Sequence, residues 1–96
     1  MTKADIVADI ATETGLEKTE VLRAVEAFMG TIKTSLIRGK NVYLRGFGSF
    51  IVKERAQKTG RNISKKTTII IPAHNIPSFK PSKTFVESVK KDVKVR

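Results

Sequence analysis

The sequence predicts an α+β fold in one domain, with two helices first, then an antiparallel sheet with a long β-ribbon, and a short helix last. Apolar residues recur with the helical period of 3.6 before Gly39, and alternate with a period of two after it. A polar, basic stretch flanked by strand-like runs then predicts a protruding ribbon. Four parts of this single domain follow: a helical body at 1–39, a sheet at 40–53 and 72–81, an arm at 54–71, and a C-terminal helix and tail at 82–96.

Two helices are predicted in the N-terminal part. Thr2 and Asp5 have the spacing of a capping box, and Gly15 is a typical C-terminal stop. The second helix begins near residues 17–20, where acidic side chains favour the positive end of the helix dipole, and ends before Gly39. Its apolar stripe is about five turns long, and the first helix has too few apolar residues to cover it. We therefore expect a second copy of the chain to supply the missing surface.

The strands are predicted from alternation at residues 41–44 and 49–53, joined by a turn around Phe47. The isoleucines at 69–71 return toward the sheet and stop at Pro72, and Ser82 is a suitable N-cap for the last helix. The spacing of the phenylalanines favours core packing over stacking on bases. The core shared by two copies is expected to contain Phe28, Met29, Ile32, Leu36, Leu44, Phe47, Phe50 and Phe79.

Charge is distributed unevenly along the chain. The net charge is +10, from 19 Lys and Arg against 9 Asp and Glu. Residues 1–37 carry four basic and six acidic residues, whereas residues 38–84 carry eleven basic residues and one acidic residue, Glu54. This asymmetry indicates an N-terminal scaffold and a C-terminal part that binds a polyanion.

Several classes of function are disfavoured by composition. The absence of Cys removes disulfides, thiol nucleophiles and Cys-based zinc sites. His74, the single histidine, has no neighbouring cluster of metal-ligating residues, and no catalytic constellation or phosphate-binding loop is present. We expect neither an enzyme nor a metal or other cofactor. The first ten residues resemble neither a signal peptide nor a membrane span, so we expect a cytoplasmic protein with no membrane partner.

Four motifs in the C-terminal part carry a family likeness that extends over essentially the whole chain. They are Gly46-Phe47-Gly48-Ser49-Phe50, Gly60-Arg61-Asn62, Ile71-Pro72-Ala73 and Pro77-Ser78-Phe79-Lys80-Pro81. In this order and register the chain resembles the HU/IHF family of DNA-binding proteins. The resemblance implies an intertwined homodimer in the bacterial nucleoid, with a helical base, a saddle made by the sheets, and two arms that reach around duplex DNA. It leaves open a heterodimer with a paralogue.

The chain departs from the family pattern at the end of the arm. A proline that wedges between base pairs usually follows Gly-Arg-Asn in the family, and here this position is Ile63. The usual glycine near the tip is replaced by Lys66. An isoleucine can still act as an intercalating wedge, because the requirement is a stiff apolar side chain that displaces stacked bases.

The residues expected to contact DNA lie mainly on the arm. Arg55, Lys58 and Arg61 are spaced three apart on its outgoing strand, suited to phosphate contact and to entry of Arg61 into the narrow groove. Lys80 and Lys83 lie near the predicted start of the last helix and Lys3 near that of the first, and the resemblance implies a phosphate contact for Lys83. The predicted DNA-binding set is Lys53, Arg55, Lys58, Arg61, Asn62, Ile63, Lys65, Lys66, Lys80, Lys83 and Lys3.

The function predicted from these features is that of a histone-like protein that binds duplex DNA through the minor groove with little sequence specificity, bending and compacting it. Two alternatives remain at this point. One is a site-specific DNA-bending protein of the IHF kind, and the other is a basic protein that binds RNA.

Overall fold

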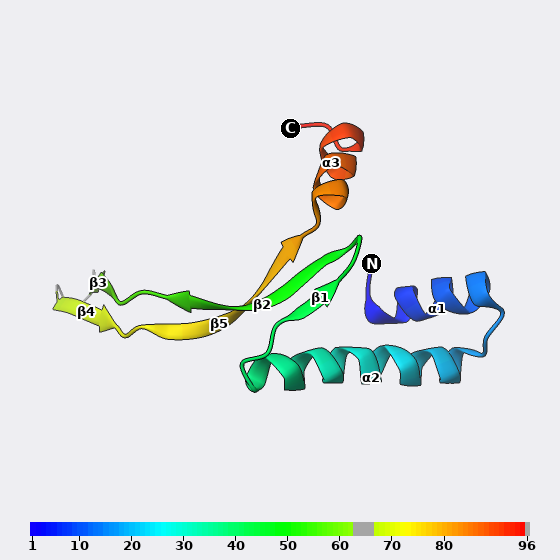
Figure 1. Ribbon diagram of the computed structural model, residues 1–96, viewed down its shortest axis with the longest axis horizontal. Helices are drawn as coiled ribbons and strands as arrows, with labels where there is room; N and C mark the ends of the chain where they lie inside the picture. The colour runs from blue at the N-terminus through cyan, green and yellow to red at the C-terminus, as the bar shows by residue number, and fades with distance from the viewer. Residues whose placement is uncertain (63–66, 96) are drawn as a thin grey trace. The chain divides into compact units, whose positions relative to one another are not determined.

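The computed structural model describes residues 1–62 and 67–95, and describes the side chains in these ranges except those of residues 61, 62, 67 and 68. The predicted contacts of Ile63, Lys65 and Lys66 therefore lie outside the described residues. The described chain forms three helices and five strands in the order ααβββββα (Figure 1). It divides into two compact units, residues 1–35 and residues 36–96, which are described in turn.

The first helix, α1 (Lys3–Thr14), begins and ends as the sequence predicts. The Thr2 hydroxyl accepts a hydrogen bond from the Asp5 amide, and the Asp5 carboxylate accepts one from the Thr2 amide at 2.8 Å. These bonds from Thr2 lower the pKa of Asp5 below its usual value of 3.8 because they favour the ionised carboxylate. Gly15 ends the helix with φ of 77°, where its amide donates to the Ala11 carbonyl.

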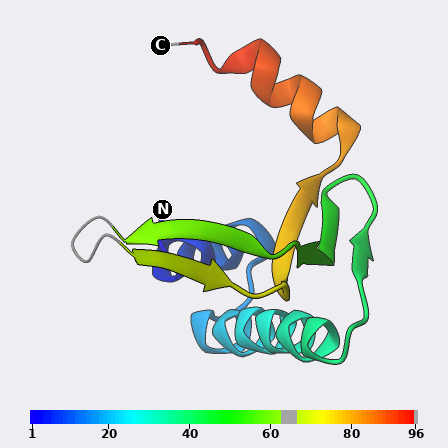
Figure 2. The same ribbon diagram turned by 90° about the vertical axis from the view of Figure 1, so that its left-hand side faces the viewer.

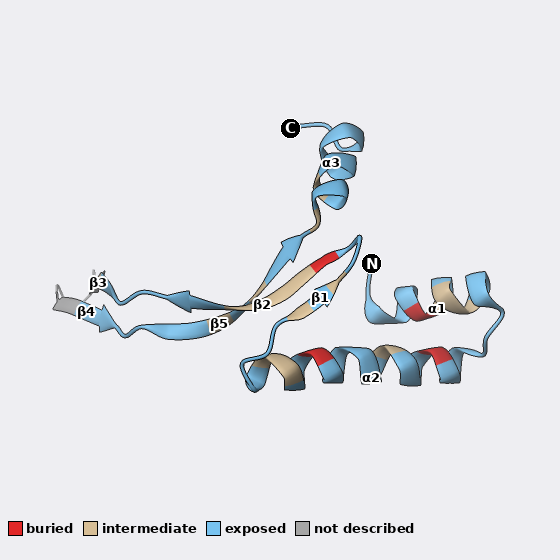
Figure 3. Cartoon of the chain, viewed as in Figure 1, coloured by how far each residue is buried: buried red, intermediate tan, exposed pale blue. Residues whose placement is uncertain are grey.

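The second helix, α2 (Lys18–Ile37), packs only part of its surface within the first unit. Val21 and Ile32 are buried on α2, as Val7 is on α1 (Figure 3). The Lys3 ammonium donates to the Glu26 carboxylate, which ties the start of α1 to the middle of α2. In contrast, Phe28 is 50% exposed, so the apolar stripe extends beyond what α1 covers.

The second unit contains two antiparallel sheets. Strands β1 (Val42–Leu44), β2 (Gly48–Arg55) and β5 (His74–Pro81) form a three-stranded sheet with β2 in the centre. Strands β3 (Lys58–Asn62) and β4 (Thr67–Ile71) form a two-stranded ribbon between β2 and β5 in the sequence, at the place predicted for the arm. Helix α3 (Lys83–Asp92) follows β5, as Figure 2 shows.

Burial in β2 differs from the predicted alternation. Residues 49–52 are all half-buried, where the sequence pattern predicts buried and exposed positions in turn. Both faces of β2 are partly covered because β2 is the central strand, and side chains of β1 and β5 lie beside its own side chains on each face.

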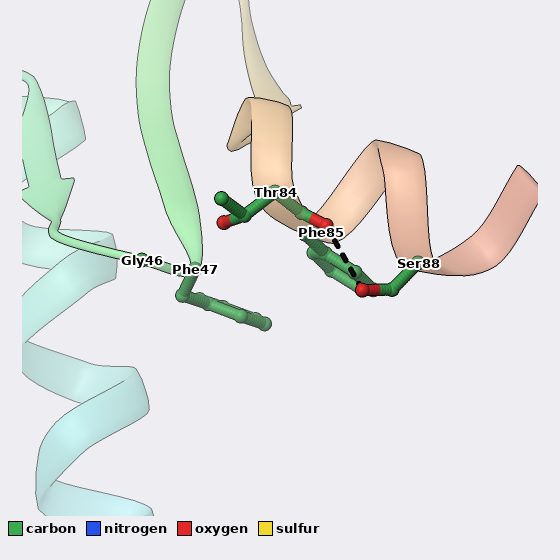
Figure 4. A pocket seen from close by; sticks show the side chains of 5 residues that line it. All are labelled: Gly46, Phe47, Thr84, Phe85 and Ser88. Carbon is green, nitrogen blue, oxygen red and sulfur yellow. Dashed lines mark hydrogen bonds between the residues drawn. The ribbon is translucent and has the colours of Figure 1, made fainter. Parts of the chain in front are cut away.

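A row of phenylalanine rings links the sheet to α3. The rings of Phe50 and Phe79 lie 4.9 Å apart, those of Phe79 and Phe47 5.1 Å apart, and those of Phe47 and Phe85 5.6 Å apart. The last two rings are nearly parallel and line a pocket together with Gly46, Thr84 and Ser88 (Figure 4). These aromatic contacts contribute packing beyond simple area burial, and they seat α3 against the β1–β2 turn.

Candidate nucleic-acid interface

The register of the three-stranded sheet separates its side chains into two faces. Phe50 lies opposite Val42 on β1 and Phe79 on β5, which makes one face apolar. Ser49 lies opposite Tyr43 and Lys80, and these three side chains share the other face because partners in an antiparallel ladder point the same way. We call this second face the polar face; its members on the three strands are Tyr43, Ser49, Ile51, Lys53, Arg55, His74, Ile76, Ser78 and Lys80.

The polar face carries three of the predicted DNA-binding cations. Lys53 pairs with Ile76 and Arg55 pairs with His74, so both basic residues of β2 project on the same side as Lys80. All three are exposed. Glu54, between the two basic residues of β2, pairs with Asn75 on the opposite face. The alternation therefore gathers positive charge on one side of the sheet.

Two further cations lie where α3 begins. Arg45, Lys80 and Lys83 line one surface pocket that also includes Ser82. Ser82 fixes this corner, because its hydroxyl donates to the Gly46 carbonyl at 3.0 Å and accepts from the Phe85 amide at 3.2 Å, as expected of the predicted N-cap. The helix start and the three cations give this pocket a positive potential that suits a phosphate group.

The ribbon continues the series of basic residues along the chain. Lys58 is exposed at the start of β3, opposite Ile71. Arg61 and Asn62 are placed through their backbones, which pair with Thr68 and Thr67 on β4. The sheet and the ribbon belong to one unit and together hold most of the predicted DNA-binding residues.

Lys3 is not brought together with the other predicted residues. It lies in the first unit, and its ammonium is already paired with Glu26. Its positive charge is therefore partly neutralised in the free chain, and a phosphate would have to compete with this carboxylate.

Sequence reasoning missed three residues of this surface. Tyr43 is 72% exposed on the polar face, Arg45 lies beside Lys80 and Lys83, and His74 pairs with Arg55. The Nδ1–H of His74 donates to the Pro72 carbonyl at 2.9 Å, which directs Nε2 away from this bond. The alternation of side chains along each strand could have indicated Tyr43 and His74. It does so only once the pairing of β1, β2 and β5 is known, because the pairing decides which side chains share a face.

Two other kinds of site are absent from the described residues. No group of three His, Cys, Asp or Glu side chains that could hold a metal ion is found in residues 1–62 and 67–95. In the same part of the chain, no helix has both the length and the apolar character that a membrane span requires.

Known proteins that resemble this chain are bacterial DNA-binding proteins. The model of the family described as "Bacterial DNA-binding protein" matches residues 1–90. The chain is 42% identical over 91 residues to the DNA-binding protein HU of Thermus thermophilus, covering 95% of this chain and 94% of the relative. It is 39% identical over 90 residues to the HU protein of Geobacillus stearothermophilus, covering 94% and 100%. Among solved structures, HU from a cocrystal of the Anabaena protein with DNA superposes with a TM-score of 0.88 at 34% identity, covering 93% of this chain and 97% of that one.

Proposed function

Since the chain belongs to the family of bacterial DNA-binding proteins, we propose that it is a histone-like architectural protein of the nucleoid, which binds duplex DNA with little sequence specificity and bends and compacts it. The similarity to HU proteins over nearly the whole chain supports this function. Binding and kinking through the minor groove is characteristic of HU and IHF proteins, so the groove geometry in this proposal comes from the family rather than from the residues themselves.

The observation that carries the proposal is the one-sided charge of the sheet. Lys53, Arg55 and Lys80 share the polar face, and the ribbon that extends from the same unit adds Lys58. Phosphate contacts from such residues give affinity without reading the bases, because every DNA sequence presents the same backbone. A binder of low sequence specificity follows from this arrangement.

The active form in this proposal is a dimer of two identical chains. Within the described residues, the hydrophobic side chains that are buried are those of Val7, Val21 and Ile32, which is a small core for a chain of 96 residues. The predicted dimer core residues Phe28, Met29, Phe47 and Phe79 are each more than a third exposed. Burying such large apolar side chains against a second copy would supply the stabilisation that the single chain lacks.

Bending is assigned to the end of the arm. In each chain Ile63 would insert as an apolar wedge between base pairs, after Arg61 and Asn62 have followed the minor groove. Unstacking a base step costs a few kcal/mol, which the additional phosphate contacts of a bent duplex offset.

The proposal is tested by measuring DNA affinity and bending together. A dimer that contacts about ten phosphates should lose affinity with a log–log salt slope of about −9. A gel-shift titration at several salt concentrations gives the slope, and energy transfer between the ends of a labelled duplex gives the bend. Nearly salt-independent binding, a duplex that stays straight when bound, or a preference for duplex RNA would each overturn it. A strong consensus recovered from random duplexes would favour a site-specific binder instead.

A further inference from the structure

The two faces of the β3–β4 ribbon differ in character. Ile71 lies opposite Lys58 and Ile69 lies opposite Gly60, so these four residues share one face, which we call the isoleucine face. Ile70 lies opposite Thr59 on the other face. Ile69 is 46% exposed and Ile71 42% exposed, and Ile70 is 64% exposed.

The isoleucine face is open for close approach along β3. Among the described atoms, a Cβ added at Gly60 would meet the Ile69 carbonyl oxygen at 3.8 Å, an ordinary van der Waals distance. The missing side chain at Gly60 leaves bare backbone beside Ile69, and such positions are used where a ligand approaches a strand closely. The isoleucine face therefore consists of the apolar side chains of Ile69 and Ile71 on β4, the bare backbone of Gly60 on β3, and the ammonium group of Lys58 at one end.

The minor groove of a nucleic acid offers both apolar and anionic groups that match the isoleucine face. Its sides are formed by sugar rings, which present C–H groups in DNA, and its rims carry the phosphates that Lys58 can pair with. In RNA each sugar adds a 2′-hydroxyl, which is displayed in the minor groove. An isoleucine side chain can pack on deoxyribose, but it offers no hydrogen bond to a 2′-hydroxyl from which it removes water.

We propose that the isoleucine face makes the arm selective for deoxyribose, with Ile69 and Ile71 packing on the sugars of the minor groove and disfavouring ribose. This inference rests on the proposed binding of the arm in the groove, and it adds which residues distinguish DNA from RNA and by what chemistry. Ile70, on the opposite face, does not take part.

The variants follow from the register of the ribbon. Ile69→Thr with Ile71→Thr keeps β-branched side chains suited to a strand and supplies hydroxyls that can pair with a 2′-hydroxyl. Ile70→Thr is the matched control, because it makes the same change on the same strand on the other face. The full-length chain is used for every measurement.

Three duplexes of one sequence separate hydroxyl chemistry from groove shape: DNA, RNA, and RNA with 2′-fluoro sugars, which stays A-form without the hydroxyl donors. Affinities are measured by fluorescence anisotropy at one salt concentration. The parent chain should bind DNA most tightly and should bind 2′-fluoro RNA more tightly than RNA. In the double variant the ratio of 2′-fluoro RNA to RNA affinity should fall by about fivefold or more, the effect expected for one buried hydroxyl that regains a partner.

Each outcome bears on a different statement. Failure of the parent chain to bind duplex DNA would overturn the proposed function itself. DNA binding with an unchanged fluoro-to-hydroxyl ratio in the double variant would overturn the present inference alone. A change of that ratio in Ile70→Thr and not in the double variant would show that the opposite face meets the sugars, which also overturns it. If sedimentation without nucleic acid shows that only the double variant loses self-association, the face is a protein contact and the inference is wrong.

Discussion

Gly48 is a position where the addition of a single methyl group should damage the fold. A Cβ there would lie 2.6 Å from the Lys80 carbonyl oxygen and 2.7 Å from two ring atoms of Phe79. The first contact is with backbone that pairs with β2, and the second is with the ring of Phe79, which lies between those of Phe50 and Phe47 in the phenylalanine row. Neither can move without separating β2 from β5 or displacing a packed ring.

The magnitude follows from these contacts. Overpacking of a tightly packed site costs about 1–3 kcal/mol, and we expect Gly48→Ala to lie at the upper end because the nearest atom belongs to the backbone. A loss of about 3 kcal/mol lowers the melting temperature of a domain of this size by roughly 12–24 °C. Gly60→Ala is the matched control, because it also adds a Cβ to a strand glycine, and among the described atoms that Cβ meets an ordinary contact at 3.8 Å.

The assay is thermal unfolding followed by circular dichroism, with all proteins at one concentration so that association affects them equally. Gly60→Ala should remain within about 0.5 kcal/mol of the parent chain. Equal melting temperatures for the two alanine variants would refute the reasoning, since they would show that β2 and β5 are not packed as closely at Gly48 as the structure has them.

Three further predictions concern charge, capping and bending. Lys53→Gln with Arg55→Gln should reduce the salt slope of DNA binding by about 2 per chain, because each removed phosphate contact lowers it by about one; a weaker affinity with an unchanged slope would contradict their phosphate role. In the folded chain the pKa of the Asp5 carboxyl lies below its ordinary value of 3.8. The capping box therefore stabilises the fold fully at pH values above 3.8, and this stabilisation is lost as the pH falls through the folded pKa of Asp5. Acid titration of the melting temperature should therefore show a shallower decline for Asp5→Asn, and identical curves would count against the hydrogen bonds from Thr2. Ile63→Ala should lower DNA bending more than affinity, and energy transfer in a labelled duplex that reports an unchanged bend would remove the wedge role.

The helices and strands were predictable because their signals are local. The capping box of Thr2 and Asp5 and the C-terminal glycine define α1 within fifteen residues. Ser82 defines the start of α3 in the same way, through a bond to the amide of Phe85. Each signal depends on hydrogen-bonding capacity or backbone conformation within a few residues, and it is therefore present in the sequence before any tertiary contact forms.

The composition of the polar face was only partly predictable because it depends on pairing. Charge density indicated Lys53, Arg55 and Lys80, but the sequence gives no register between strands that are separated by the whole arm. Tyr43 joins the face only because it lies opposite Ser49, which lies opposite Lys80. A shift of one residue in this ladder would move every side chain of a strand to the other face.

The same register links stability to function in this chain. Gly48 lies opposite Pro81 on β5, and Phe50, two residues further along β2, lies opposite Phe79. Because side chains alternate along a strand, placing Phe50 on the apolar face obliges Lys53 and Arg55 to lie on the polar face. A one-residue slip of β2 would expose Phe50 and turn both cations toward the apolar side, at a cost in burial and desolvation together. The phenylalanine row therefore holds the cationic surface in place, and a substitution that loosens the row should weaken DNA binding without removing any charge.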